Sequence, residues 1–137
     1  MKIEYIEFNV LGDNRGSLIA LEEENEVPFQ IKRVYYIFDT QVNVKRGLHA
    51  HKELEQLMIC INGSCKLSLD DGQTKLEILL DTPSKGIRIR KMIWHEMYEF
   101  SQDCILMVLA DDFYSESDYI RNYLEFQKAY EMKRDSN

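Results

Sequence analysis

Hydrophobic and polar residues alternate over short stretches in most of the chain, which is the pattern of half-buried β-strands. Apolar and β-branched residues concentrate in seven runs, at residues 18–21, 31–38, 57–61, 66–69, 76–80, 87–89 and 105–110. Clusters of Gly, Asp, Asn, Pro and Ser separate these runs. Two of the turns, Asn62-Gly63 and Asp71-Gly72, carry dipeptides that tight hairpins prefer. Many short strands at this spacing predict a mainly β sandwich or barrel of antiparallel strands.

The last quarter of the chain has a different pattern. Apolar and aromatic residues fall close to the helical period at positions 120, 123, 124, 126 and 130. Ser117 is a suitable N-cap, and Asp118 is favourable in a first turn. The pattern therefore predicts one C-terminal helix that starts after Ser117. We expect a β-barrel over residues 1–112 and a helical extension of the same domain over residues 113–137.

Length and composition narrow the class of protein. A chain of 137 residues is long enough for one domain with a substantial core. No run approaches the roughly 18 apolar residues of a membrane span, and the first residues lack the apolar core of a signal peptide, so we expect a cytoplasmic protein without a membrane partner. Cys60, Cys65 and Cys104 lie among apolar residues without Cys-x-x-Cys spacing, which favours buried thiols over a disulfide or zinc site.

The net charge of -7 argues against nucleic acid as a partner, because non-specific binding to nucleic acid depends on a basic surface. An acidic protein can still bind an anionic small molecule where a few arginines create a local positive field. The arginines in strand or turn segments are candidates for this role: Arg15, Arg33, Arg46, Arg88 and Arg90.

The three histidines are the strongest indication of a functional site. His49 and His51 are two residues apart in a strand-like segment, so their side chains lie on the same face, about 7 Å apart. His95 lies far downstream in a second strand-like segment. Imidazole exchanges protons near neutrality, since its ordinary pKa is about 6.5, which makes a proton-transfer site plausible.

Several motifs together resemble the cupin-type nucleoside-diphosphate-sugar 3,4-ketoisomerases over nearly the whole chain. These motifs include Arg46-Gly47-Leu48-His49-Ala50-His51, Asn62-Gly63, Trp94-His95-Glu96-Met97 and Asp118-Tyr119-Ile120-Arg121. The resemblance implies a cupin jelly-roll β-barrel and an isomerase that acts on thymidine-diphosphate (TDP) 4-keto-6-deoxyglucose. It also implies a homodimer with exchanged strands, no cofactor, and a route to 3-amino sugars of cell-surface glycans such as lipopolysaccharide O-antigen or S-layer glycans.

The resemblance also assigns roles to residues. His51 is the expected base at sugar C3, and His49 is expected to handle a proton on the oxygen or at C4. Arg46 is expected to hold a diphosphate oxygen, because arginine forms bidentate charged hydrogen bonds. Arg33 and Tyr35 share one strand face, and either line the same pocket or belong to the barrel surface and core.

Arg15 and His95 are expected to influence the stereochemistry of the product. Arginine and histidine at these positions resemble the branch that forms the 3-keto-6-deoxygalactose epimer, whereas the other branch forms the 3-keto-6-deoxyglucose epimer. A cation and a titratable ring beside C4 would favour proton delivery to one face. For His95, a hydrogen-bonded core histidine is an equally plausible interpretation.

Three other functions remain open from the sequence. His49, His51, Glu55 and His95 fall where metal-dependent cupins place their ligands, although the cationic turn before His95 is unfavourable beside a dication, and the resemblance implies no catalytic metal. The related 3,5-epimerases are longer and fit poorly. A cupin that binds a ligand without catalysis is the third alternative, because a fold does not determine a function.

Overall fold

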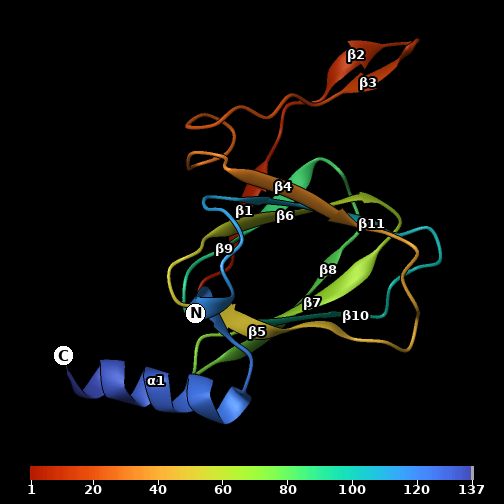
Figure 1. Ribbon diagram of the computed structural model, residues 1–137. Coiled ribbons are helices and arrows are strands. Elements are labelled where there is room, and N and C mark those ends of the chain that lie inside the picture. The colour runs from red at the N-terminus through yellow and green to blue at the C-terminus, as the bar shows by residue number, and fades with distance from the viewer. Residues whose placement is uncertain (137) are drawn as a thin grey trace.

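Two antiparallel five-stranded sheets form a jelly-roll-like sandwich in the computed structural model, which describes residues 1–136 (Figure 1). The first sheet has the order β1 (Glu4–Glu7), β9 (Lys85–Ile89), β6 (Gln56–Asn62), β11 (Ile105–Ala110) and β4 (Arg33–Ile37). The second has the order β12 (Tyr119–Ile120), β5 (Arg46–His51), β10 (Trp94–Tyr98), β7 (Cys65–Asp70) and β8 (Lys75–Leu80). The predicted mainly β fold is therefore confirmed.

Four elements lie outside these sheets. Strands β2 (Leu11–Asp13) and β3 (Gly16–Leu18) form a separate hairpin that projects away from the sandwich (Figure 1). A 3-10 turn, η1 (Glu116–Asp118), precedes β12, and helix α1 (Tyr123–Asp135) ends the described chain. Within this part of the chain, no helix is both long and apolar enough to span a bilayer.

Strand β6 occupies the centre of the first sheet and is buried on both faces. Met58 and Cys60 belong to the main core between the sheets. Leu57 and Ile59 lie on the outer face, where a second cluster from the N-terminal segment covers them. Burial of each large aliphatic side chain contributes about 2 kcal/mol, so this double coverage fixes the register of the central strand.

Of the two hairpins predicted from turn dipeptides, only one is present in the structure. Asp71-Gly72 connects the paired strands β7 and β8, so this predicted hairpin is confirmed, with Gly72 at a φ of 100°. The hairpin prediction at Asn62-Gly63 is wrong, because β6 and β7 belong to different sheets. Gly63 does adopt a φ of 71°, and a Cβ there would run into Ser101. The dipeptide indicates the backbone conformation correctly, but here the conformation serves a crossover between sheets.

The predicted helix starts later than the sequence pattern indicates. Helix α1 begins at Tyr123, and the Asn122 side chain, rather than Ser117, caps it by accepting from the Glu125 amide at 3.1 Å. Residues 119–120 instead pair with β5 as strand β12. The strand predicted at 18–21 is also shifted, because β3 ends at Leu18. Ile19 and Leu21 pack against the second core cluster outside any strand, so burial without pairing explains their apolar character.

Candidate active site

A bulge in β5 positions the first histidine of the site. His49 pairs with His95 of β10, and Gly47 pairs with Glu96, so Leu48 is the extra residue in β5. Gly47 and Leu48 have φ values of 85° and 59°, which lie in the left-handed region that residues other than glycine rarely adopt. A Cβ at position 47 would lie 2.9 Å from the His95 carbonyl oxygen. The Gly47 in the sequence motif is therefore required to bring β5 close to β10.

The three histidines that the sequence analysis selected form one cluster. The ring centroid of His49 lies 4.9 Å from that of His51 and 4.6 Å from that of His95. Each Nδ1 faces an acceptor: the Gly47 carbonyl at 2.9 Å, an Asp118 carboxylate oxygen at 3.0 Å and the Ile93 carbonyl at 3.2 Å, respectively. Each Nδ1 therefore carries a hydrogen, which leaves each Nε2 as the atom that accepts a proton.

Burial keeps the cluster uncharged at neutral pH. Desolvation, assisted by the neighbouring His51, lowers the pKa of His49 to about 4. Desolvation and the nearby His49 lower the pKa of His95 to about 3. The pKa of His51 is also lowered by burial, although its hydrogen bond to Asp118 opposes the shift. Neutral imidazoles of this kind can take up a proton from a bound molecule.

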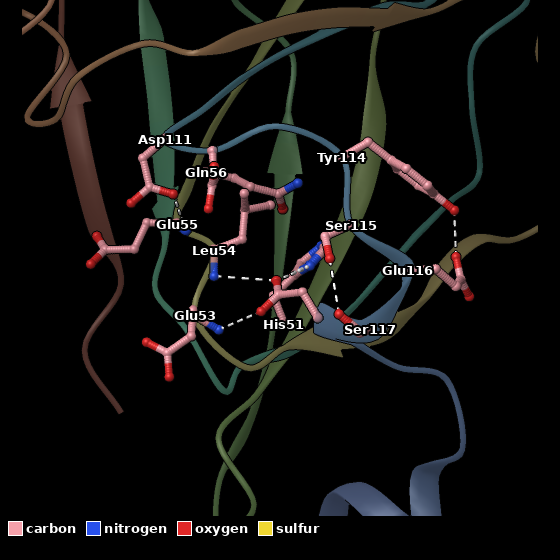
Figure 2. A network of polar contacts seen from close by, with 12 residues as sticks. His51, Glu53, Leu54, Glu55, Gln56, Asp111, Tyr114, Ser115, Glu116 and Ser117 are labelled. Atoms are coloured by element: carbon pink, nitrogen blue, oxygen red, sulfur yellow. Dashed lines mark hydrogen bonds and ion pairs between the residues drawn. The ribbon is translucent and has the colours of Figure 1, made fainter.

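The Asp118 carboxylate orients the His51 ring through a hydrogen bond from Nδ1. One carboxylate oxygen accepts from the Glu53 amide at 2.8 Å, and the other accepts from His51 and from the Leu54 amide at 3.3 Å. Figure 2 shows His51 beside the backbone of Glu53 and Leu54 at the end of β5. The sequence pattern predicts Asp118 in the first turn of a helix, and this contact was not predicted. The only available signal was its place in the Asp118-Tyr119-Ile120-Arg121 motif.

A cavity of about 470 Å³ opens beside the cluster. Five of the seven predicted site residues line it: Arg33, Tyr35, Arg46, His49 and His95. His51 lies deeper and is only 3% exposed, and its Nε2 is buried without a hydrogen-bond partner among residues 1–136. The cavity wall also contains three polar residues that the sequence analysis missed: Lys45, Tyr119 and Arg121.

Four cations surround this cavity although the chain carries a net charge of -7. They are Arg33, Lys45, Arg46 and Arg121. The Arg121 guanidinium lies over the Tyr119 ring at 4.1 Å and pairs with Glu116 at 2.7 Å, which fixes its orientation. The Nε of Arg33 is buried and has no hydrogen-bond partner within the described residues. The positive wall and this unsatisfied donor are suited to an anionic ligand such as a phosphate group.

The four-ligand metal site considered from the sequence is not assembled. Glu55 forms a 2.7 Å ion pair with Arg88 and does not belong to the histidine group. The candidate ligand atoms of the three histidines lie within 4.8 Å of one another and could approach a common ion. The four cations at the cavity are unfavourable beside a dication, so the arrangement fits an anion better than a metal.

Arg15 does not reach the cavity of its own chain. It lies at the tip of the β2–β3 hairpin, where its side chain is 87% exposed and pairs with Asp13 at 2.6 Å. The predicted role of Arg15 at the sugar is therefore not fulfilled within one chain. The sequence could not show this, because the separation between the hairpin and the cavity depends on the tertiary arrangement.

Comparison with known proteins places the chain in a family. Residues 1–131 match the family model described as "FdtA: WxcM-like, C-terminal". The chain is 54% identical over 128 residues to the TDP-4-oxo-6-deoxy-alpha-D-glucose-3,4-oxoisomerase of Aneurinibacillus thermoaerophilus, covering 93% of this chain and 92% of the relative.

Two solved structures show the same fold. The TDP-quinovose 3,4-ketoisomerase WlaRB of Campylobacter jejuni is 52% identical, with a TM-score of 0.88 and coverage of 92% of this chain and 97% of that chain. A variant of the 3,4-ketoisomerase QdtA from Thermoanaerobacterium thermosaccharolyticum, in complex with TDP-4-keto-6-deoxyglucose, is 39% identical, with a TM-score of 0.92 and coverage of 95% and 94%. The chain therefore belongs to the FdtA (WxcM-like) family of cupin-type sugar-nucleotide 3,4-ketoisomerases, which are isomerases.

Proposed function

We propose that this protein converts TDP-4-keto-6-deoxyglucose into a TDP-3-keto-6-deoxy sugar. The observation that carries the proposal is a cluster of neutral histidines at a cavity lined by four cations. The names of the relatives support the substrate, since one acts on TDP-4-oxo-6-deoxyglucose and another binds TDP-4-keto-6-deoxyglucose. We assign the diphosphate to the cationic wall that includes Arg33 and Arg46, with the sugar at the histidines.

The chemistry requires only proton transfers. The C4 ketone acidifies the proton on C3, and its removal gives an enediolate. A proton then returns at C4, while the C3 hydroxyl loses its proton and becomes the new ketone, so that oxidation at C3 balances reduction at C4. Bound diphosphate and the developing enediolate favour protonated imidazole, which raises the pKa of the base from its low value in the unliganded protein.

His49 and His51 share the proton transfers in this proposal. The family resemblance implies that His51 removes the C3 proton. The position of His49 on the cavity wall, with His51 deeper and tied to Asp118, instead favours His49 at C3 and His51 as its partner. His49 Nδ1 donates to a carbonyl, so its Nε2 is available to accept the C3 proton.

We propose the 3-keto-6-deoxygalactose epimer as the product. His95, one of the two residues on which this assignment rests, lies at the cavity beside His49. The second candidate is the 3-keto-6-deoxyglucose epimer, which the 52% identity to a TDP-quinovose 3,4-ketoisomerase favours, since quinovose is 6-deoxyglucose. In either case the C3 ketone is the group that a transamination needs, which fits a route to a 3-amino-3,6-dideoxy sugar.

Proton NMR of the chelator-treated protein with TDP-4-keto-6-deoxyglucose tests the proposal. In D₂O we expect deuterium at C3 of the substrate and a 3-keto product. In H₂O a small coupling between H4 and H5 would identify the galactose epimer, and a large one the glucose epimer. Absence of turnover that only a divalent metal restores would contradict the metal-free mechanism, and absence of any turnover would contradict the function.

We further propose a homodimer in which the β2–β3 hairpin of one chain reaches the partner. Leu11 and Leu18 of this hairpin are more than half exposed. Strand β4 forms one edge of the first sheet, and its outward residues Val34 and Tyr36 are 52% and 63% exposed. An unpaired edge with an apolar face is a docking site for a strand from a second chain. Since Arg33 of β4 lines the cavity, a hairpin docked on β4 would bring Arg15 towards the partner's site.

A mixing experiment tests whether Arg15 acts across the dimer. We expect Arg15→Ala alone to give an altered epimer ratio and His49→Asn alone to give no turnover. Reassembled together, the two variants should restore the wild-type product, because the Arg15→Ala chain keeps His49 and receives Arg15 from its partner. If Arg15 acts within its own chain, no mixed dimer contains a complete site, and the wild-type ratio will not return. Sedimentation analysis of each variant verifies that dimers form.

A further inference from the structure

The sandwich contains a cluster of three thiols that the proposed reaction does not use. Cys60 lies near the end of β6, Cys65 begins β7, and Cys104 directly precedes β11. Each is buried in the main core with an exposed fraction of 1%, which confirms the expectation of buried thiols. All three sulfur atoms lie within 4.8 Å of one another, and those of Cys60 and Cys104 are 3.9 Å apart. None of them lines the catalytic cavity.

Hydrogen bonds between the turns at residues 62–64 and 101–103 hold the thiols in position. The Asn62 side-chain amide donates to the Asp103 carbonyl at 3.0 Å, which joins the end of β6 to the segment before β11. Ser64 and Ser101 join the same segments, through a backbone bond of 2.8 Å and a bond of 2.9 Å from the Ser64 amide to the Ser101 hydroxyl. The sulfur positions are therefore fixed by local hydrogen bonds as well as by packing in the core.

The spacing of the sulfur atoms is compatible with trigonal coordination of a soft ion, since one pair is 3.9 Å apart and all three atoms lie within 4.8 Å of one another. Metal–thiolate bonds of about 2.3 Å place three sulfurs of a planar trigonal site about 4.0 Å apart. Zinc sites are almost always four-coordinate, and within residues 1–136 the group contains only these three ligand residues. Thiolates without oxygen or imidazole ligands select soft ions such as Cu(I). The cluster therefore fits a three-coordinate monovalent ion better than zinc.

We propose that Cys60, Cys65 and Cys104 form a binding site for Cu(I), separate from the catalytic cavity. Each thiol that becomes a ligand releases its proton to solvent, and the ion offsets one of the resulting negative charges in the core. The site requires little rearrangement, since the sulfur atoms already lie close to the required separations. A bound ion that joins β6, β7 and the segment before β11 would stabilise both sheets.

Anaerobic titration with Cu(I), in competition with a chromophoric Cu(I) chelator, tests the proposal. We expect the wild-type protein to bind one ion per chain and to gain thermal stability. Cys65→Ala should weaken binding by about 10-fold or more, because it removes one of the three ligands. His49→Asn is the matched control for the histidine cluster and should bind as the wild type does. X-ray absorption of the loaded protein should show three sulfur neighbours.

Three results would overturn the proposal: no binding by the wild-type protein, equal binding by Cys65→Ala, or binding that His49→Asn removes. Cys104→Ala provides a second test if Cys65→Ala does not fold. The rate at which a thiol reagent labels the folded protein, compared with and without bound Cu(I), gives a measurement that is independent of the chelator. Labelling of the wild-type protein that Cu(I) does not slow would also count against the site.

Discussion

Replacing His49 with asparagine should reduce turnover of TDP-4-keto-6-deoxyglucose by at least about 100-fold, the lower end of what a general base contributes. An asparagine amide can still donate to the Gly47 carbonyl, as His49 Nδ1 does, so the strand should keep its structure. What is lost is the Nε2 atom at the cavity. We expect a loss of product formation and of deuterium exchange at C3, both followed by proton NMR.

His51→Asn separates the roles of the two histidines. Its amide can still donate to Asp118, which preserves the contact behind the ring. If His49 removes the C3 proton, His51→Asn should lose product formation but keep part of the C3 exchange, whereas His49→Asn should lose both. The opposite pattern would support the sequence-based assignment of His51 to C3. Unchanged binding of TDP by both variants is the control for folding, and full activity in either would exclude that histidine from the reaction.

The local period of a strand explains why the histidine pair was predictable. Residues two apart in a strand always share a face, so His49 and His51 had to lie together once β5 formed. The same rule placed Arg33 and Tyr35 on one face of β4, and both line the cavity. The positive φ of Gly47 was not predicted, although glycine is the residue that tolerates it best.

Contacts between distant segments were not predictable from these local rules. Asp118 lies 67 residues from His51, and a residue typical of a first helical turn gave no sign that its carboxylate faces an imidazole. Asn62-Gly63 was misread for the same reason, because the dipeptide specifies the backbone at the turn but not the sheet that the chain enters next. Arg15 is the extreme case, because its proposed role depends on a second chain.

Asp118→Asn should reduce kcat by about 100-fold or more, with a small change in KM, because Asp118 acts through His51 and not on the substrate. The carboxylate accepts from two backbone amides and from His51 Nδ1. An asparagine whose amide group faces the imidazole would favour the tautomer with hydrogen on Nε2, which removes the atom that accepts a proton. Nitrogen NMR of His51 should show the change of tautomer.

Asp111→Asn is the matched control for this experiment. Asp111 accepts from the Glu55 amide at 3.0 Å (Figure 2). The Nδ1 atoms of the three histidines face other acceptors. A purely structural role for Asp118 predicts that the two variants lose stability and activity in parallel. A positioning role predicts that Asp111→Asn keeps kcat close to that of the wild type, while Asp118→Asn loses it in a folded protein.

The pH dependence of kcat/KM gives a third way to distinguish a positioning role of Asp118 from a purely structural one. In the wild-type protein, the Asp118 carboxylate opposes the fall in the pKa of His51 that burial causes. Without that negative charge the pKa of His51 should fall further. The neutral imidazole, which is the form that accepts a proton, then persists to lower pH. The acid limb of the kcat/KM profile, measured on the residual activity of Asp118→Asn, should therefore move to lower pH. An acid limb at the same pH as in the wild-type protein would show that His51 does not control it.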